Sequence, residues 1–282
     1  MEHLMADKWP IATGIGSNAA NWNGGTKPVP GDVVYADGKT ITIDENVTVS
    51  QLRTDTRSGG TTGGGFNTSG SVTVNADAYS GTSQCLIVNE SGIQNGNSTG
   101  GSVTSANGTV LLNGGVQNGN SYAGSVVGSL GTSISKGGVQ NGIATGGSVA
   151  GTIATQCING GFHNGDSVGG NGSGAYGTFL TIGGFFYGRA MSGGSYGLRV
   201  AVGGIAVVTE ASGVSAVSKG VLASGGGQIV VIQKEIGLYA AVIGANTDTT
   251  YNNIPFAKPP ALSTQAAMRL GNRMSQRGAI LS

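Results

Sequence analysis

The chain has little charge. Charged residues make up 10% of its 282 residues and the net charge is +1, whereas an average soluble protein is about 25% charged. A disordered chain combines low hydrophobicity with high net charge, but this one is 38% hydrophobic. Its composition therefore fits neither an ordinary disordered tail nor an ordinary enzyme.

Long apolar runs are also lacking. The longest, GLYAAVIGA at 237–245, falls well short of the ~18 residues of a membrane helix. The opening MEHLMADKWPIATGIG contains early acidic residues and no signal-peptide core. The two cysteines are too few for a disulfide framework. We expect a soluble protein, not exported by the Sec pathway, with free thiols that suit a reducing cytoplasm.

What the chain does have is glycine, 55 residues of it, arranged in an internal repeat. The repeat has a period of about 23 residues, extends from about Ser69 to Ile243 and loosens after its fifth copy. The motif GSV recurs with this period at Gly101, Gly124 and Gly147, and strand-like segments such as TVLLNGG and TSISKGG keep the same register. A second motif recurs at the same spacing. Its copies are GIQNG at Gly92, GVQNG at Gly115 and Gly138, GFHNG at Gly161 and GFFYG at Gly184.

A period of this length predicts a β-solenoid. It is too short for a propeller blade or a helical hairpin, and the segments lack the periodicity of a helix. Each repeat offers three short strand candidates, for example GVQN, AGSVV and TSIS, separated by Gly or Asn corners. Three asparagines precede glycine at one corner, where they are expected to supply the left-handed conformation that the corner needs. We expect them to form a stacked ladder, with ligand binding as the alternative. These coil-corner residues are Asn118, Asn141 and Asn164.

The GG-V-Q-N-G and GG-S-V-x-G signature is similar to the Gly-rich repeats of autotransporter passengers. The resemblance implies a right-handed parallel β-helix. Autotransporters also carry a signal peptide and a C-terminal membrane barrel, and the sequence contains neither pattern. The resemblance therefore predicts the fold and not a shared role.

The segment before the repeats has a different pattern. W-N-G, P-G-D-V-V, G-K-T-I-T-I-D and V-T-V-S-x-L follow one another between Asn21 and Leu52. This series resembles a module of tailed-bacteriophage virion proteins that opens a β-helix and caps its first coil, and a solenoid needs such a cap because an uncovered end coil is an open sheet edge. Trp22 is expected to cover the apolar end of the core, with stacking on a carbohydrate as the alternative.

The C-terminal tail contains the one amphipathic-helix candidate. No acidic residue follows Asp248, so Lys258 and three arginines give the tail a net charge of about +4. One interpretation is a solvated face; the other is a docking peptide that binds a groove on another virion protein. Nucleic-acid binding is disfavoured because few aromatics accompany the charges. The docking residues are Leu262, Ala266, Leu270 and Met274 on the apolar stripe and Arg269, Arg273 and Arg277 beside it.

Acidic residues are too sparse for glycoside hydrolysis in the central coils. Lys136 and Asp166 are the only charged residues between Ser91 and Gly188, and the common mechanism needs two carboxyl groups facing one sugar. Glu210 and Glu235 are separated by little more than the length of one coil, but we expect two solvated surface glutamates.

Metal and disulfide sites are not expected either. His163, Asp166 and Cys157 are too few and too irregular in spacing for zinc. Cys85 and Cys157 lie roughly three coils apart, which is ~14 Å at ~4.8 Å per coil and beyond disulfide reach. We expect no catalytic residues, cofactor or metal.

The sequence thus predicts an all-β, right-handed parallel β-helix with an N-terminal β cap and an extended or helical tail. The expected function is that of a non-enzymatic bacteriophage virion protein, a fibre or spike-like appendage or a capsid decoration protein, assembled in the host cytoplasm. Alternatives are a polysaccharide-binding or -degrading tailspike and a bacterial surface adhesin. Expected partners are capsid or tail proteins, further copies of the chain, as in a trimer, and a host surface glycan, with no membrane. The expected parts are an anchoring segment at 1–30, a cap module at 31–68, the solenoid at 69–243 and a docking tail at 244–282.

Overall fold

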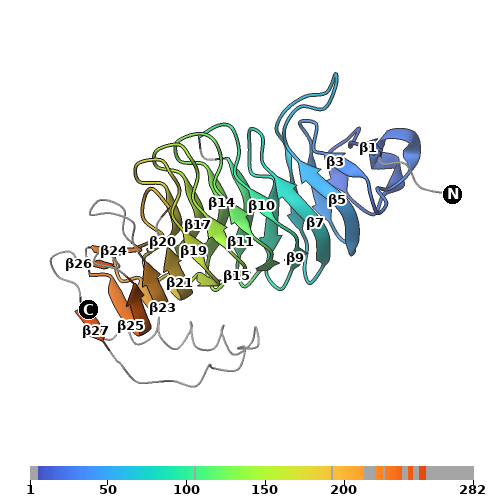
Figure 1. Cartoon of the computed structure of the whole chain (residues 1–282). Coiled ribbons are helices and arrows are strands. Elements are labelled where there is room, and N and C mark those ends of the chain that lie inside the picture. The colour runs from blue at the N-terminus through green and yellow to red at the C-terminus, as the bar shows by residue number, and fades with distance from the viewer. Residues whose placement is uncertain are drawn as a thin grey trace.

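The computed structural model describes residues 6–104, 106–191, 193–212, 220–224, 226–236, 241–243 and 248–251. Over these residues the chain forms a parallel β-solenoid whose coils stack in sequence order along one axis (Figure 1). The all-β prediction is therefore confirmed. The described residues contain only two single-turn 3-10 helices, η1 (Ala19–Asn21) and η2 (Asn23–Gly25). Among them no helix has the length and apolar character that crossing a membrane requires.

Two sheets run along the solenoid, and both are built from strands of successive coils. The 11-stranded sheet takes one strand from each coil. Its members are β2 (Gly14–Ile15), β4 (Thr40–Ile43), β6 (Gly65–Thr68), β8 (Leu86–Asn89), β11 (Asn107–Leu112), β14 (Leu130–Ser135), β17 (Ile153–Ile158), β20 (Tyr176–Thr181), β22 (Leu198–Ala201), β24 (Val221–Ser224) and β26 (Ala241–Ile243).

The 16-stranded sheet forms the rest of each coil's wall. In the central coils it takes two short strands per coil, which merge into one long strand toward both ends. Its members are β1 (Asp7–Lys8), β3 (Val33–Tyr35), β5 (Val47–Arg53), β7 (Thr73–Tyr79), β9 (Ile93–Asn95), β10 (Ser98–Thr99), β12 (Val116–Asn118), β13 (Ser121–Tyr122), β15 (Val139–Asn141), β16 (Ala144–Thr145), β18 (Phe162–Asn164), β19 (Ser167–Val168), β21 (Phe185–Met191), β23 (Ile205–Ser212), β25 (Gln228–Ile236) and β27 (Asp248–Tyr251).

The turn after β11 joins the two sheets. Asn113 (φ 52°) and Gly114 (φ 93°) both have left-handed backbone, a pair of conformations that reverses a strand tightly. The corner asparagines predicted to be left-handed are instead the last residues of β12, β15 and β18, so this part of the prediction is wrong. The left-handed turn lies earlier in each coil and recurs at Glu90, Lys136, Asn159, Ile182 and Val202.

The segment AGSVV was expected to be a strand and is a loop. The second short strand is β13, and Ala123 and Gly124 after it leave the sheet. A Cβ on Gly124 would lie 2.3 Å from the carbonyl oxygen of Gly101 in the preceding coil. The loops of successive coils therefore stack so closely that only glycine fits here, and Val127 is left 54% exposed.

One ladder of apolar residues forms the centre of the core. β8, β11, β14, β17, β20 and β22 each place one residue in it, in register from coil to coil. All members are fully buried, and each buried aliphatic side chain contributes roughly 1.5–3 kcal/mol. The ladder consists of Val88, Leu111, Ile134, Cys157, Leu180 and Val200.

A second interior row is polar. Gln94, Gln117 and Gln140 are fully buried and lie in register in β9, β12 and β15. Each side-chain amide donates to a carbonyl oxygen of the preceding coil; for Gln117 the acceptor is Gly96, at 2.9 Å. Since a buried amide is costly without partners, these bonds hold neighbouring coils in register.

The N-terminal segments belong to the same two sheets as the repeats. Strands β3 and β4 of 31–68 pair with β5 and β6, which pair onward with β7 and β8. Coil length varies here, since Val33 pairs with Gln51 whereas Val47 pairs with Val74. This uneven spacing explains why the segment has no visible repeat.

Trp22 covers the N-terminal end of the core, as expected. The side chain is 4% exposed, and Nε1 donates to the carbonyl oxygen of Gly16 at 2.9 Å. An antiparallel bridge between Trp22 and Pro10 holds the backbone in place. A ring buried in this way cannot serve as a stacking platform for a sugar.

Ile134 and Ser133 are neighbours on opposite sides of β14 and test which side faces the core. Ile134 is fully buried and Ser133 half-buried on the outer side. We expect Ile134→Ala to lower the free energy of unfolding by about 2–5 kcal/mol, because it leaves a cavity in the ladder, and Ser133→Ala to change it by less than about 0.5 kcal/mol. Urea unfolding followed by far-UV circular dichroism measures both, and equal losses would contradict the assignment of faces.

Candidate binding surfaces

His163 is part of the coil interior. It follows Gln140 in the polar row and has no exposed surface. Its Nε2 donates to the carbonyl oxygen of Gly142 at 2.9 Å, and its Nδ1 lies 2.7 Å from Oγ1 of Thr178. Burial lowers the pKa of the imidazole to about 4, so the ring is neutral near pH 7. With both nitrogens bonded, His163 copies the bonding of Gln94 and Gln117, whose amide oxygens accept from Thr109 and Thr132.

Asp166 and Cys157 do not converge on His163 as ligands. Asp166 pairs with Arg189 of the next coil, whose Nε donates to Oδ1 at 3.0 Å, and this hydrogen bond lowers the pKa of the carboxyl. Cys157 is in the apolar ladder, where burial raises the pKa of its thiol. Within the described ranges, no three His, Cys, Asp or Glu side chains form a metal-binding group. Cys85 is a second buried, free thiol.

Glu210 and Glu235 are not directly opposite one another. In the register of β23 and β25, Glu210 lies opposite Lys234 and Glu235 opposite Ala211, next to a bulge. Glycoside hydrolysis requires two carboxyl groups that face one sugar, and the register does not pair these two residues.

The three coil-corner asparagines form a ladder on the outside of the solenoid. The amide nitrogen of each donates to the amide oxygen of its counterpart one coil earlier, at 3.0 Å for Asn118 and Asn141 and 3.1 Å for Asn164. Asn95 continues the ladder to Asn75 at 2.8 Å. A side-chain amide is both donor and acceptor, so identical residues can bond in an endless row, and these amides serve the stacking of the coils.

The predicted docking residues lie outside the described residues. These are Leu262, Ala266, Leu270, Met274, Arg269, Arg273 and Arg277. Before them, β27 continues the 16-stranded sheet by pairing with β25. The sheet therefore extends past residue 243, where the repeat pattern was expected to end.

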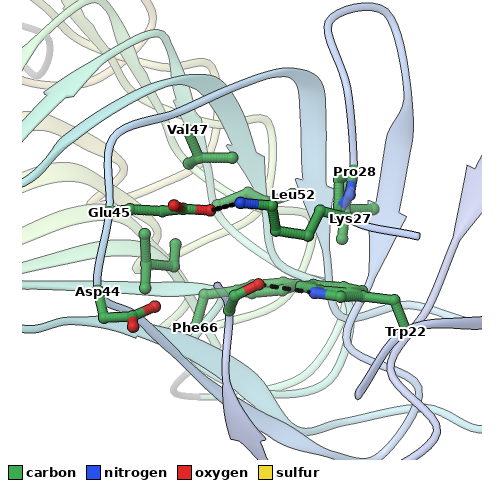
Figure 2. Close-up of a pocket in the computed structure, with 11 residues that line it drawn as sticks. Trp22, Lys27, Pro28, Asp44, Glu45, Val47, Leu52 and Phe66 are labelled. Atoms are coloured by element: carbon green, nitrogen blue, oxygen red, sulfur yellow. Dashed lines mark hydrogen bonds and ion pairs between the residues drawn. The ribbon is translucent and has the colours of Figure 1, made fainter. Parts of the chain in front are cut away.

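An apolar pocket opens at the N-terminal end of the solenoid (Figure 2). It holds about 400 Å³ of empty space, part of it open to solvent. Figure 2 shows the Trp22 ring along one side and the Lys27–Glu45 ion pair, at 2.6 Å, on the other. Core residues close the pocket from within, namely Val34, Ile43, Val47, Leu52 and Phe66. The pocket is the end of the core, only partly covered by the cap.

Aromatic residues gather on the outer face of the 11-stranded sheet, near its C-terminal end. The rings of Tyr176 and Tyr196 stack with centroids 6.0 Å apart, and Phe179 lies 6.0 Å from Tyr176. The Arg199 guanidinium carbon is 4.7 Å from the Phe179 centroid. We call these four residues the aromatic patch. The sequence did not reveal the patch because its members come from three segments. The spacing of the GG pairs shortens at this point, and the same shortened spacing separates Phe179 from Arg199, which could have indicated that these two residues lie side by side.

The sequence matches no protein-family model and no curated protein. Among solved structures, one similar chain is a hyperglycosylated fragment of TibA, whose glycosylation TibC catalyses. The two share 18% sequence identity, with 89% of this chain and 98% of that chain covered and a TM-score of 0.26. A likeness of this size says nothing about the role of the present chain.

The buried histidine predicts a pH-dependent stability. Because the folded pKa of about 4 lies below the ordinary 6.5, the unfolded chain binds a proton first as the pH falls. The stability from His163 is present above pH 6.5 and is lost toward pH 4, by about 2 kcal/mol between pH 7 and 5. His163→Gln, which restores the residue of the preceding coils, should remove this loss.

Urea unfolding of both proteins at pH 7, 6 and 5 measures the difference. An equally steep decline in the His163→Gln variant would show that other groups cause it.

Proposed function

We propose that this chain is a non-enzymatic attachment protein, a rigid β-solenoid that holds a binding surface at a distance from the structure that carries it. The proposal rests on what the reactive side chains of the central coils contact. His163, Asp166 and Cys157 are all engaged in packing or in bonds between coils. These three side chains stabilise the stacking of the coils.

The rigidity of the coils supports the same role. Successive coils are joined through both sheets, and the central coils are joined also through the buried glutamines and the corner asparagines. In stacked repeats, stability comes from contacts between neighbours, so length can be extended without a larger core. A stalk built in this way suits contact with a distant surface.

Two settings fit such a protein. The Gly-rich repeats resemble those of autotransporter passengers, which favours an adhesin of the bacterial cell surface. The N-terminal module resembles one found in bacteriophage virion proteins, which favours an appendage or a capsid decoration protein. In the second setting, the tail with its apolar stripe and arginines would attach the chain to another virion protein, and further copies of the chain would complete a trimer. Immunogold labelling of cells and of particles separates the settings.

An attachment protein should bind surface polysaccharide without cleaving it. We expect the purified full chain to be retarded in gels that contain extracted cell-envelope polysaccharide, while the number of reducing ends stays constant. Reducing ends that increase with the native protein, but not with heat-denatured protein, would identify a polysaccharide-degrading enzyme and contradict the proposal. Lack of any retardation would also contradict it.

A further inference from the structure

The aromatic patch lies on the outside of the solenoid. Along β20, Thr178 and Leu180 are fully buried, whereas Phe179 between them is half-buried, as are Tyr176 and Arg199. The alternation follows the two faces of a strand. The rings and the guanidinium therefore form part of the outer surface, supported from beneath by the core.

Arg199 carries a charge without a carboxylate partner within the described residues. Arg53, Arg57 and Arg189 each form an ion pair with an aspartate. Arg199 instead lies on the rings of Tyr176 and Phe179, and its one hydrogen bond to a described residue is a long contact of 3.5 Å to the Tyr176 hydroxyl. A guanidinium has five N–H donors in a rigid fork. The Arg199 Nε is buried without a partner among the described residues, so the donors that remain for a ligand are those of the two terminal nitrogens.

The patch lies on a row of the solenoid that changes from coil to coil. The same register position holds a different residue in each of six successive coils, namely Ile87, Val110, Ser133, Gln156, Phe179 and Arg199. On the buried side of the same strands, Thr132, Thr155 and Thr178 do not change. From Ser133 to Phe179 the outer position therefore changes from small and polar to aromatic while the buried threonines stay the same, so packing of the core does not require this change. At Arg199 the buried neighbour changes as well, to Leu198.

We propose that the aromatic patch binds an acidic glycan, a chain of sugars that carry carboxylates. The rings offer flat apolar surfaces to the C–H face of a sugar, and Arg199 offers two parallel N–H donors to a carboxylate. Gln156, next to Phe179 in the preceding coil, adds an amide for sugar hydroxyls. This inference rests on the proposed attachment function and names its ligand class and its site.

The sparse positive charge argues for a glycan over a nucleic acid. Binding to nucleic acid depends on many phosphate contacts, but Lys136 is the only basic residue from Ser91 to Gly188. A single guanidinium among rings suits one carboxylate at a time. A stable protein partner would require an interface of about 1,200 Å² or more, larger than four half-buried side chains provide.

Polygalacturonate and polysialate serve as acidic probes for the full chain, with dextran as the neutral one. We expect the chain to bind at least one acidic polymer at least ten times more tightly than dextran. Arg199→Gln should weaken this binding tenfold or more, Arg199→Lys should weaken it less because the charge remains without the fork, and Tyr176→Ala should weaken it by a similar factor to Arg199→Gln.

Lys136→Gln is the matched control, because it removes one positive charge from an exposed turn outside the patch; its binding should stay within twofold of the unmodified chain. Urea midpoints identify any variant that has lost its fold. Tyr176→Phe, which keeps the ring, should retain most of the binding in the event that Tyr176→Ala unfolds.

Four results would overturn the assignment. Unchanged binding by Arg199→Gln would place the acidic glycan elsewhere and leave the attachment function intact. Binding to envelope polysaccharide but to neither acidic polymer would remove the acidic specificity, whereas binding to no polysaccharide would contradict attachment itself. Duplex DNA that binds as tightly as the acidic polymers, and only when Arg199 is present, would reassign the patch to phosphates.

Discussion

The structure depends on parallel stacking in register, in which nearly every residue of the central coils lies beside its own counterpart in the next repeat. A side chain fits such a stack only if it can lie next to a copy of itself. Val, Leu and Ile satisfy this by packing, and Asn and Gln by donating to one neighbour and accepting from the other. Like charges in a row would repel. The low charge of the chain follows from this constraint.

The repeat made most of the central fold predictable. Its period alone indicates parallel coils and separates Cys85 from Cys157. The burial of individual residues could not be predicted in strands of two or three residues. Such strands are too short for an alternating pattern to show which side chains face the core. Gln117 is therefore a buried residue that the sequence does not mark as one, and AGSVV is a loop although its valines suggest a strand.

The N-terminal region and the aromatic patch escaped prediction for a different reason. From Val33 to Val74 the coils differ in length, so residues that meet in space share no fixed spacing in the sequence. The patch joins Tyr176 and Phe179 to Tyr196 and Arg199 across a coil that is shorter than those before it. Where the repeat departs from its regular length, side chains that are not copies of one another meet, and there the proposed binding chemistry lies.

If each regular coil is a complete stacking unit, the solenoid tolerates the deletion of one whole coil. Removal of residues 115–137 joins Gly114 to Gly138 and preserves the register of both sheets. Small-angle X-ray scattering should then show a folded particle about 4.8 Å shorter with unchanged circular dichroism per residue, whereas removal of only 126–137 should disrupt the fold. Unfolding of the whole-coil deletion, or equal tolerance of both deletions, would show that a regular coil is not the unit of stacking.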